Sequence, residues 1–103
     1  MFVTMNRIFV NPDYAYQFEE RFRNRAHEVD KMEGFVRNLV LRPNSKDEPY
    51  VVMTFWRSQD DFSKWVNSDA FKKGHAKSGT LPKEAFSTES HLETFDVFLD
   101  SEE

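Results

Sequence analysis

The first stretch of the chain, residues 2–10, has the alternation of a β-strand but carries apolar side chains on both faces. One face would hold Phe2, Thr4, Asn6, Ile8 and Val10, and the other Val3, Met5, Arg7 and Phe9. A strand that is apolar on both faces must be covered on both. Because a chain of 103 residues provides helices for only one face of a sheet, we expect another subunit to cover the second face.

A helix is predicted directly after this strand. Asn11 and Pro12 form a typical helix start, an amide cap followed by proline at the first helical position. The apolar residues that follow recur at spacings of three and four, which predicts a core-facing stripe on a helix that reaches about Lys31. The stripe consists of Ala15, Phe18, Phe22, Ala26 and Val29. Arg21 and Arg25 flank this stripe, so we expect them at the rim of whatever it covers.

Three more strands are predicted, at residues 35–42, 50–56 and 92–99. The polar residues 43–49 lie between the first two and indicate an antiparallel hairpin. Strict alternation through the first of these strands assigns its two faces, with Phe35, Leu39 and Leu41 on one and Val36 and Val40 on the other. Residues 78–90 show no period and are expected to form a loop, whose length makes it a candidate flap.

A second helix is predicted between the third and fourth strands. Ser58, followed three residues later by an acid, is typical of an N-cap. The apolar residues at helical spacing after it are Phe62, Trp65 and Val66. Residues 67–69 favour caps, and Ser68 is a plausible second N-cap, so we expect the helix to bend or break there. Phe71 and His75, four residues apart, share a face in either case.

The order of these elements is β-α-β-β-α-β, the ferredoxin-like split βαβ arrangement of an α+β protein. We therefore expect one domain over residues 1–103. Aromatic residues make up 16% of the chain, which favours either wide burial of the sheet or an aromatic-lined cavity.

Composition excludes several classes of function. The net charge of −4, with acids and bases mixed along the chain, argues against a nucleic-acid partner. No apolar run is long enough to span a membrane and no charged-then-apolar leader precedes the domain, so we expect a cytoplasmic protein without a membrane partner. Because there is no cysteine, disulfides, thiolate nucleophiles and Cys-based metal sites are excluded. Metal chemistry would need histidine, carboxylate or a prosthetic group.

On the residues alone, every candidate site residue has an ordinary explanation. Trp65 on a helix face is most often a core residue, and Asn6 in a strand is most often an edge or bulge residue. A structural role also outweighs a ligand role for His75, although Gly74 beside it would allow a flat ligand to come close. His27 and His91 have no second ligand at a metal-binding spacing.

Together, Asn6, Trp65 and His75 give the chain a family resemblance. The set resembles the IsdG-type heme-degrading monooxygenases, which belong to the antibiotic-biosynthesis-monooxygenase superfamily of dimeric α+β barrels. The resemblance covers nearly the whole chain. Its matching residues are Asn6-Arg7, Arg21-Phe22, Arg25-Ala26-His27, Gly34-Phe35, Leu41-Arg42-Pro43, Trp65, Ser68-Asp69 and His75-Ala76.

The resemblance implies a role for each of these three residues. His75 would be the proximal ligand of heme iron, Asn6 would donate to dioxygen across the heme, and Trp65 would push the porphyrin out of plane. The implied apolar walls of the heme site are Ile8, Phe22, Val52, Phe62 and Phe71. Arg21 or Arg25 would lie near the propionates.

The activity implied by the resemblance is oxidative degradation of heme by a homodimer. Heme is then both substrate and cofactor, O2 opens its ring, and iron is released. Since the chain has no flavin or nicotinamide motif, an external reductant and a separate reductase are expected. Two alternatives stay open: a cofactor-free quinol-type monooxygenase in which His75 acts as acid or base, and a heme-binding protein without catalysis.

Overall fold

The chain folds into a four-stranded antiparallel sheet with helices on one face. The structure is a computed structural model that describes residues 1–24, 29–72 and 81–102. Its strands are β1 (Phe2–Ile8), β2 (Phe35–Leu41), β3 (Tyr50–Trp56) and β4 (His91–Asp96). Its α-helices are α1 (Ala15–Arg23) and α2 (Gln59–Val66), and its 3₁₀ turns are η1 (Pro12–Tyr14), η2 (Val29–Lys31) and η3 (Lys83–Ala85). The strand order is β2-β3-β1-β4, which confirms the predicted ferredoxin-like α+β arrangement.

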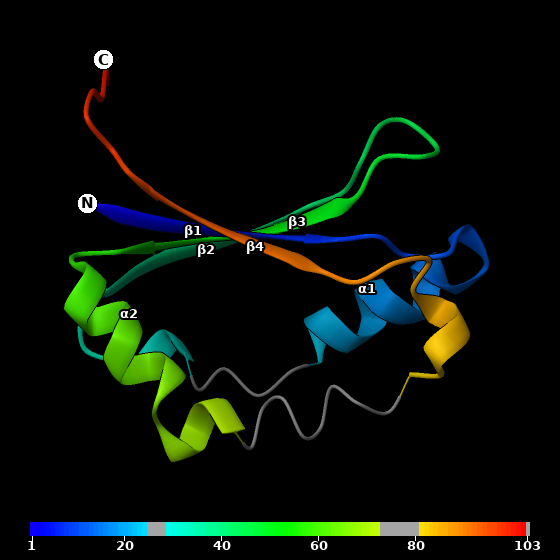
Figure 1. Ribbon diagram of the computed structural model, residues 1–103, viewed down its shortest axis with the longest axis horizontal. Coiled ribbons are helices and arrows are strands. Elements are labelled where there is room, and N and C mark those ends of the chain that lie inside the picture. The colour runs from blue at the N-terminus through cyan, green and yellow to red at the C-terminus, as the bar shows by residue number, and fades with distance from the viewer. Residues whose placement is uncertain (25–28, 73–80, 103) are drawn as a thin grey trace.

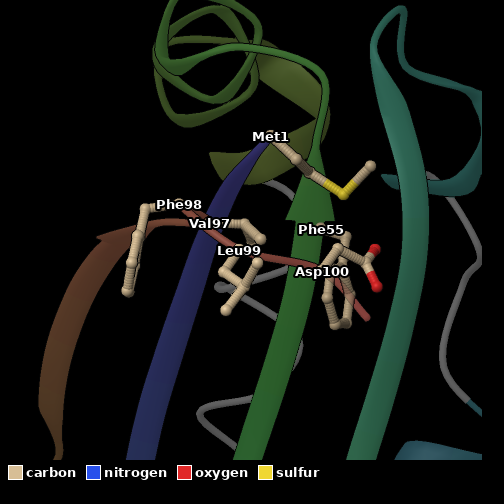
Figure 2. A pocket seen from close by; sticks show the side chains of 6 residues that line it. All are labelled: Met1, Phe55, Val97, Phe98, Leu99 and Asp100. Carbon is tan, nitrogen blue, oxygen red and sulfur yellow. The ribbon is translucent and has the colours of Figure 1, made fainter. Parts of the chain in front are cut away.

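The two faces of the sheet have different surroundings. Both α-helices lie below the sheet in Figure 1, on what we call the helix-side face. The β1 and β3 residues of this face are Phe2, Thr4, Asn6, Ile8, Tyr50, Val52, Thr54 and Trp56. The alternate residues of β1 and β3 lie on the opposite or open face. The segment after β4 crosses this face (Figure 2), and Val3 is buried there at 3% exposed.

Two aromatic clusters hold the helices at opposite ends of the helix-side face. Under α2, Trp56 is 1% exposed and Phe62 packs on it and on Phe2, with ring centroids 6.1 and 5.6 Å apart. Under α1, the rings of Phe18 and Tyr50 lie 4.8 Å apart. Each such side chain stabilises the fold by about 1.5–3 kcal/mol through burial. The middle of the helix-side face lies between the two clusters.

Strand β2 corrects the predicted assignment of its faces. Phe35 pairs with Trp56 and so lies on the helix-side face, but the register shifts between Phe35 and Arg37. A bulge adds one residue to a strand and turns the residues beyond it over. Leu39 and Leu41 therefore lie on the open face, while Phe35 shares the helix-side face with Val40.

The first helix is shorter than predicted. Asn11 is a cap as expected, but of the 3₁₀ turn η1 that leads into the helix, because its side chain accepts from the Asp13 N–H at 3.1 Å. However, α1 ends at Arg23, where the Asn24 N–H donates to the Glu20 carbonyl, and Val29–Lys31 form a separate 3₁₀ turn. The prediction of a helix that reaches about Lys31 was therefore wrong in its length. Asn24 ends the helix because its side chain also bonds the Glu20 carbonyl.

The loop before β4 is anchored over residues 81–90, so that part of it is not a free flap. Ala85 is fully buried, and its carbonyl accepts from the Asn11 N–H at 2.7 Å. The Ser87 N–H donates to the Phe9 carbonyl at 2.9 Å, and Phe86 forms an isolated bridge with Val10. Residues 78–80 of the predicted flap lie outside the described residues. Strand β4 ends at Asp96, three residues earlier than predicted.

Candidate functional site

Asn6 lies in an otherwise apolar row across the helix-side face. Strand pairing sets it beside Val52 of β3 and Leu92 of β4, and Val52 beside Val40 of β2. Asn6 is half-buried, at the middle of the sheet and between the two aromatic clusters. An amide in this position offers two N–H donors and one carbonyl acceptor to whatever lies between sheet and helices.

Trp65 lies in the last turn of α2 and is half-buried. It packs against the cluster of Phe2, Val29 and Trp56, and its ring meets Phe71 edge-on with centroids 5.5 Å apart. The predicted break in the helix comes directly after α2, which ends at Val66. The Ser68 hydroxyl accepts from the Phe71 N–H at 3.1 Å, so Ser68 caps a new helical turn at 69–72. His75 lies outside the described residues.

A cavity of about 470 Å³ opens beside the edge strand β2, at the α1 end of the sheet. Phe22 and Val40 give it an apolar wall, and the exposed guanidinium groups of Arg23 and Arg42 lie at its rim. Its other lining residues are Glu19, Leu41 and Tyr50. Both guanidinium groups are ion-paired, Arg23 with Glu20 and Arg42 with Glu19. A flat apolar ligand that carries carboxylates would fit the apolar wall and compete with these glutamates for the arginines.

Glu19 organises the polar side of this cavity. It accepts from Arg42 Nε at 2.8 Å and Nη2 at 2.5 Å, and from the Tyr50 hydroxyl at 2.5 Å. The hydrogen bond from Arg42, followed by that from Tyr50, lowers the pKa of Glu19 to about 2. Burial, followed by the bond to Glu19, raises the pKa of Tyr50 to about 12. Glu19 is therefore ionised and Tyr50 neutral across the physiological range, so this cluster positions groups and does not exchange protons.

The predicted site residues lie at several places in the fold. Asn6, Ile8 and Val52 share the helix-side face, and Phe22 lines the cavity. Phe62 lies mainly against the aromatic core, and Phe71 against Trp65. Arg21 is exposed and is not among the residues that line the described cavity, whereas Arg25 and His75 lie outside the described residues.

Sequence reasoning missed the arginines that do line the cavity. Nothing in the sequence distinguishes Arg23 from its neighbours, and Arg42 belongs to the resemblance only within Leu41-Arg42-Pro43. Arg42 lies 23 residues from Glu19 in the chain, so only the fold shows that the two pair. The signal available in the sequence was the position of Arg42 at the end of a strand, next to a hairpin.

A family model for antibiotic biosynthesis monooxygenases matches residues 1–77. The chain belongs to this family. The match includes both α-helices, three of the four strands and the predicted triad of Asn6, Trp65 and His75. This confirms the family predicted from the sequence resemblance.

Individual relatives are similar over nearly the full length. A mycobilin-producing heme oxygenase of Mycobacterium tuberculosis is 36% identical over 95% of this chain and 90% of its own length. The structure of the heme-degrader MhuD from the same organism, with two hemes bound in its active site, has a TM-score of 0.79 and 33% identity, covering 99% of this chain and all of MhuD. SnoaB, a cofactor-independent oxygenase from Streptomyces nogalater, has a TM-score of 0.74 and 29% identity, covering 99% of this chain and 97% of its own.

The described residues contain neither a cluster of metal ligands nor a helix that could span a membrane. Within residues 1–24, 29–72 and 81–102, no group of three or more His, Asp or Glu side chains is placed to hold a metal ion. His75, the predicted iron ligand, lies outside this part of the chain. In the same part of the chain, no helix has the length and apolar character needed to cross a membrane.

Proposed function

We propose that this protein is a heme-degrading monooxygenase. The observation that carries the proposal is the 36% identity with the heme oxygenase of M. tuberculosis over 95% of the chain. Heme would lie between the helix-side face of the sheet and the helices. When bound, it supplies the iron that activates O2 and the ring that is oxidised.

The described residues fit such a ligand. The cavity beside β2 combines the apolar side chains of Phe22 and Val40 with the cations of Arg23 and Arg42, which suits a macrocycle with an apolar ring and carboxylate substituents. Arg23 and Arg42 therefore join Arg21 and Arg25 as candidate partners of the propionates. Ile8, Val52, Phe62 and Phe71 are the proposed further apolar contacts.

Each central residue has a separate task in this proposal. His75 would hold the iron, and Asn6 would offer its amide N–H to the oxygen that the iron activates. Trp65, whose ring is fixed by Phe71 and by the core beneath α2, would contact the macrocycle. Val52 and Leu92 give Asn6 apolar neighbours, and a ligand that covered them would exclude water and strengthen the hydrogen bond that the Asn6 amide donates.

The electrons come from an external reductant, with a separate reductase as partner. O2 is the second substrate, and iron is a product. The cytoplasm is the proposed location.

A homodimer is the proposed assembly, paired through the open faces of two sheets. Large apolar side chains are exposed there and in the segment after β4, which would be unusual for a free surface. They include Leu41, Phe95, Val97, Phe98 and Leu99, from 40% to 96% exposed. In Figure 2, residues 97–100 cross this face, and with Met1 and Phe55 they line a cavity of about 510 Å³. A second copy that fills this cavity would also cover the open face of the sheet.

The likeness to SnoaB favours one alternative, a cofactor-independent monooxygenase on the same fold. In that function His75 would act as an acid or base towards an organic substrate. The two candidates differ in whether heme is consumed.

A hemin titration followed by ascorbate in air tests the proposal. A Soret band that forms on titration and then decays, with iron released to a chelator such as ferrozine, is the expected result. The band should fail to form with His75→Ala, while His91→Ala, which changes an exposed histidine of β4, should behave as wild type. A Soret band that forms and persists would leave a heme-binding protein without catalysis, and no band at all would favour the cofactor-independent alternative.

A further inference from the structure

Both arginines at the rim of the cavity beside β2 donate to the same carboxylate, that of Glu19. Arg42 donates from Nε at 2.8 Å and from Nη2 at 2.5 Å, and Arg23 donates from Nη2 at 3.4 Å. Two parallel N–H groups on the two oxygens of a carboxylate are the geometry in which arginine recognises a carboxylate from any source. Glu19 therefore takes up the edge of Arg42 that a carboxylate of a bound ligand would use.

Glu19 is held from the protein side, whereas the two arginines extend into solvent. The side chain of Glu19 is 19% exposed, against 56% for Arg23 and 65% for Arg42. The hydroxyl of Tyr50, a buried residue at the start of β3, donates to the same carboxylate at 2.5 Å. The bonds from Arg42 and then Tyr50 lower the pKa of Glu19 to about 2, so Glu19 is ionised wherever an ordinary carboxylate is. The carboxylate is thus a fixed part of the cavity wall, and the guanidinium groups are the parts that could turn to a ligand.

The charges at the rim of the cavity cancel. Arg23 also donates from Nη1 to Glu20 at 2.5 Å, so two glutamates match the two arginines. A ligand carboxylate gains a guanidinium only by replacing a glutamate of the same chain, which loses no translational freedom when it pairs again. The exposure of both arginines makes each new ion pair weak as well. The cavity therefore recognises carboxylates but holds them loosely.

Loose pairing matters for a ligand whose carboxylates take no part in the reaction. Opening a porphyrin ring leaves its two propionates as they are, so the substrate and the product carry the same carboxylates. A contact that is equally strong to both lowers the substrate concentration needed without speeding the chemical step. Strong pairing with Arg42 would also keep the ring-opened product in the cavity.

We propose that Glu19 competes with the propionate of the ligand for Arg42, and so keeps this pairing weak enough for the ring-opened product to leave. This inference rests on the proposed function. Glu19 is then a specificity-determining residue, because it limits how strongly the cavity prefers a porphyrin with free carboxylates to one whose carboxylates are esterified. Tyr50 is a positioning residue, because its hydroxyl holds the carboxylate of Glu19.

The test replaces Glu19 by the isosteric, neutral glutamine and compares two ligands. Hemin carries both propionates, whereas hemin dimethyl ester keeps the iron and the ring but has no ionised carboxylate. Each ligand is titrated in the same dilute detergent into wild type, Glu19→Gln and the double variant Glu19→Gln/Arg42→Gln, and the Soret band gives the affinity. Glu89→Gln, at an exposed glutamate before β4, is the matched control for the loss of one negative charge. Circular dichroism shows whether each variant is folded.

Glu19→Gln should bind hemin about fivefold more tightly than wild type, because Arg42 is then free for the propionate, and should bind the ester within about twofold of wild type. The double variant should lose most of the gain for hemin, and Glu89→Gln should match wild type. With ascorbate in air, KM for hemin and kcat should fall together in Glu19→Gln, since tighter binding of both substrate and product slows product release. More of the pigment should then stay with the protein on a desalting column.

A Glu19→Gln protein that binds hemin no more tightly than Glu89→Gln, or that gains equally for the ester, overturns Glu19 as a competitor. The proposed function stands in that case if wild type consumes hemin. If Glu19→Gln does not fold, wild type alone decides: a preference for hemin over the ester below about tenfold supports the competition, and a larger one overturns it. A wild-type protein that binds hemin without consuming it overturns the proposed function and the role of Glu19 in product release. Wild type without a Soret band overturns both proposals entirely.

Discussion

The side chain of Asp61, in the first turn of α2, lies directly against the α-carbon of Gly34, just before β2. A β-carbon at residue 34 would overlap Asp61, and the φ angle of Gly34 is +83°, where only glycine is unstrained. The Gly34 carbonyl also accepts from the Arg57 N–H at 2.9 Å. This contact fixes the start of α2 on the sheet, and with it the place of Trp65.

Gly34→Ala should therefore lower the free energy of unfolding by about 2 kcal/mol or more, because the alanine meets both an unfavourable backbone region and a side-chain overlap. Urea unfolding, monitored by circular dichroism, measures this loss in the free energy of unfolding. The double variant Gly34→Ala/Asp61→Ala should recover the part of the lost stability that the side-chain overlap causes. The part caused by the unfavourable φ angle should remain. A Gly34→Ala protein that unfolds at the wild-type urea concentration would contradict this account.

Much of the fold follows from local signals in the sequence. The cap at Ser58 is formed as predicted, since its hydroxyl accepts from the Asp61 N–H at 3.2 Å. The break at Ser68 is equally local, because a serine in this position competes with the helix for backbone hydrogen bonds. Strand alternation alone places Asn6 on one face with Phe2, Thr4 and Ile8, whereas only the fold shows that the helices cover this face.

What the sequence could not predict depends on pairing between distant residues. The bulge in β2 depends on how that strand pairs with β3, and no residue between Phe35 and Arg37 is a glycine or proline that would indicate it. In the sequence, Glu19 is only one of several charged residues on a predicted helix. The fold shows that it lies beside Arg42 and Tyr50. Such clusters need the tertiary structure.

The Tyr50 hydroxyl bond to Glu19 predicts a pH dependence of stability. The pKa of Glu19 is about 2 in the folded protein against an ordinary 4.5, so ionised Glu19 stabilises the fold above pH 4.5, and this contribution is lost as the pH falls towards 2. Tyr50→Phe removes one donor and raises this pKa. The free energy of unfolding at pH 7 should fall by about 1 kcal/mol.

Urea unfolding of Tyr50→Phe from pH 2 to pH 7 checks this prediction. The difference from wild type should shrink as the pH falls below 4.5, because Glu19 protonates in both proteins. Tyr16→Phe, at a side chain that is 74% exposed, is the control and should follow wild type throughout. A difference that stays constant down to pH 2 would show that the phenol acts through packing and not through Glu19.

Asn6→Ala should separate binding of heme from its degradation. Because the residue lies among Val52 and Leu92 and the iron ligand is elsewhere, hemin should bind within about threefold of wild type. The loss of a donor to oxygen should slow degradation by about tenfold. Loss of the Soret band under ascorbate in air measures the rate, and Asn44→Ala, in the exposed loop between β2 and β3, is the control. Degradation at the normal rate would remove Asn6 from the proposed mechanism.

The exposed segment after β4 gives a test of the proposed homodimer. Phe98 is 96% exposed, a large apolar side chain on the rim of the cavity on the open face. Buried aromatic residues contribute most to interfaces, so Phe98→Asp should weaken the dimer by about tenfold or more. Light scattering across a dilution series should then show the 12.3 kDa monomer at concentrations where the wild type is dimeric. Tyr16→Asp, an exposed aromatic on the opposite side of the sheet, should leave the dimer intact. If Phe98→Asp and wild type dissociate at the same concentration, the dimer does not use this segment.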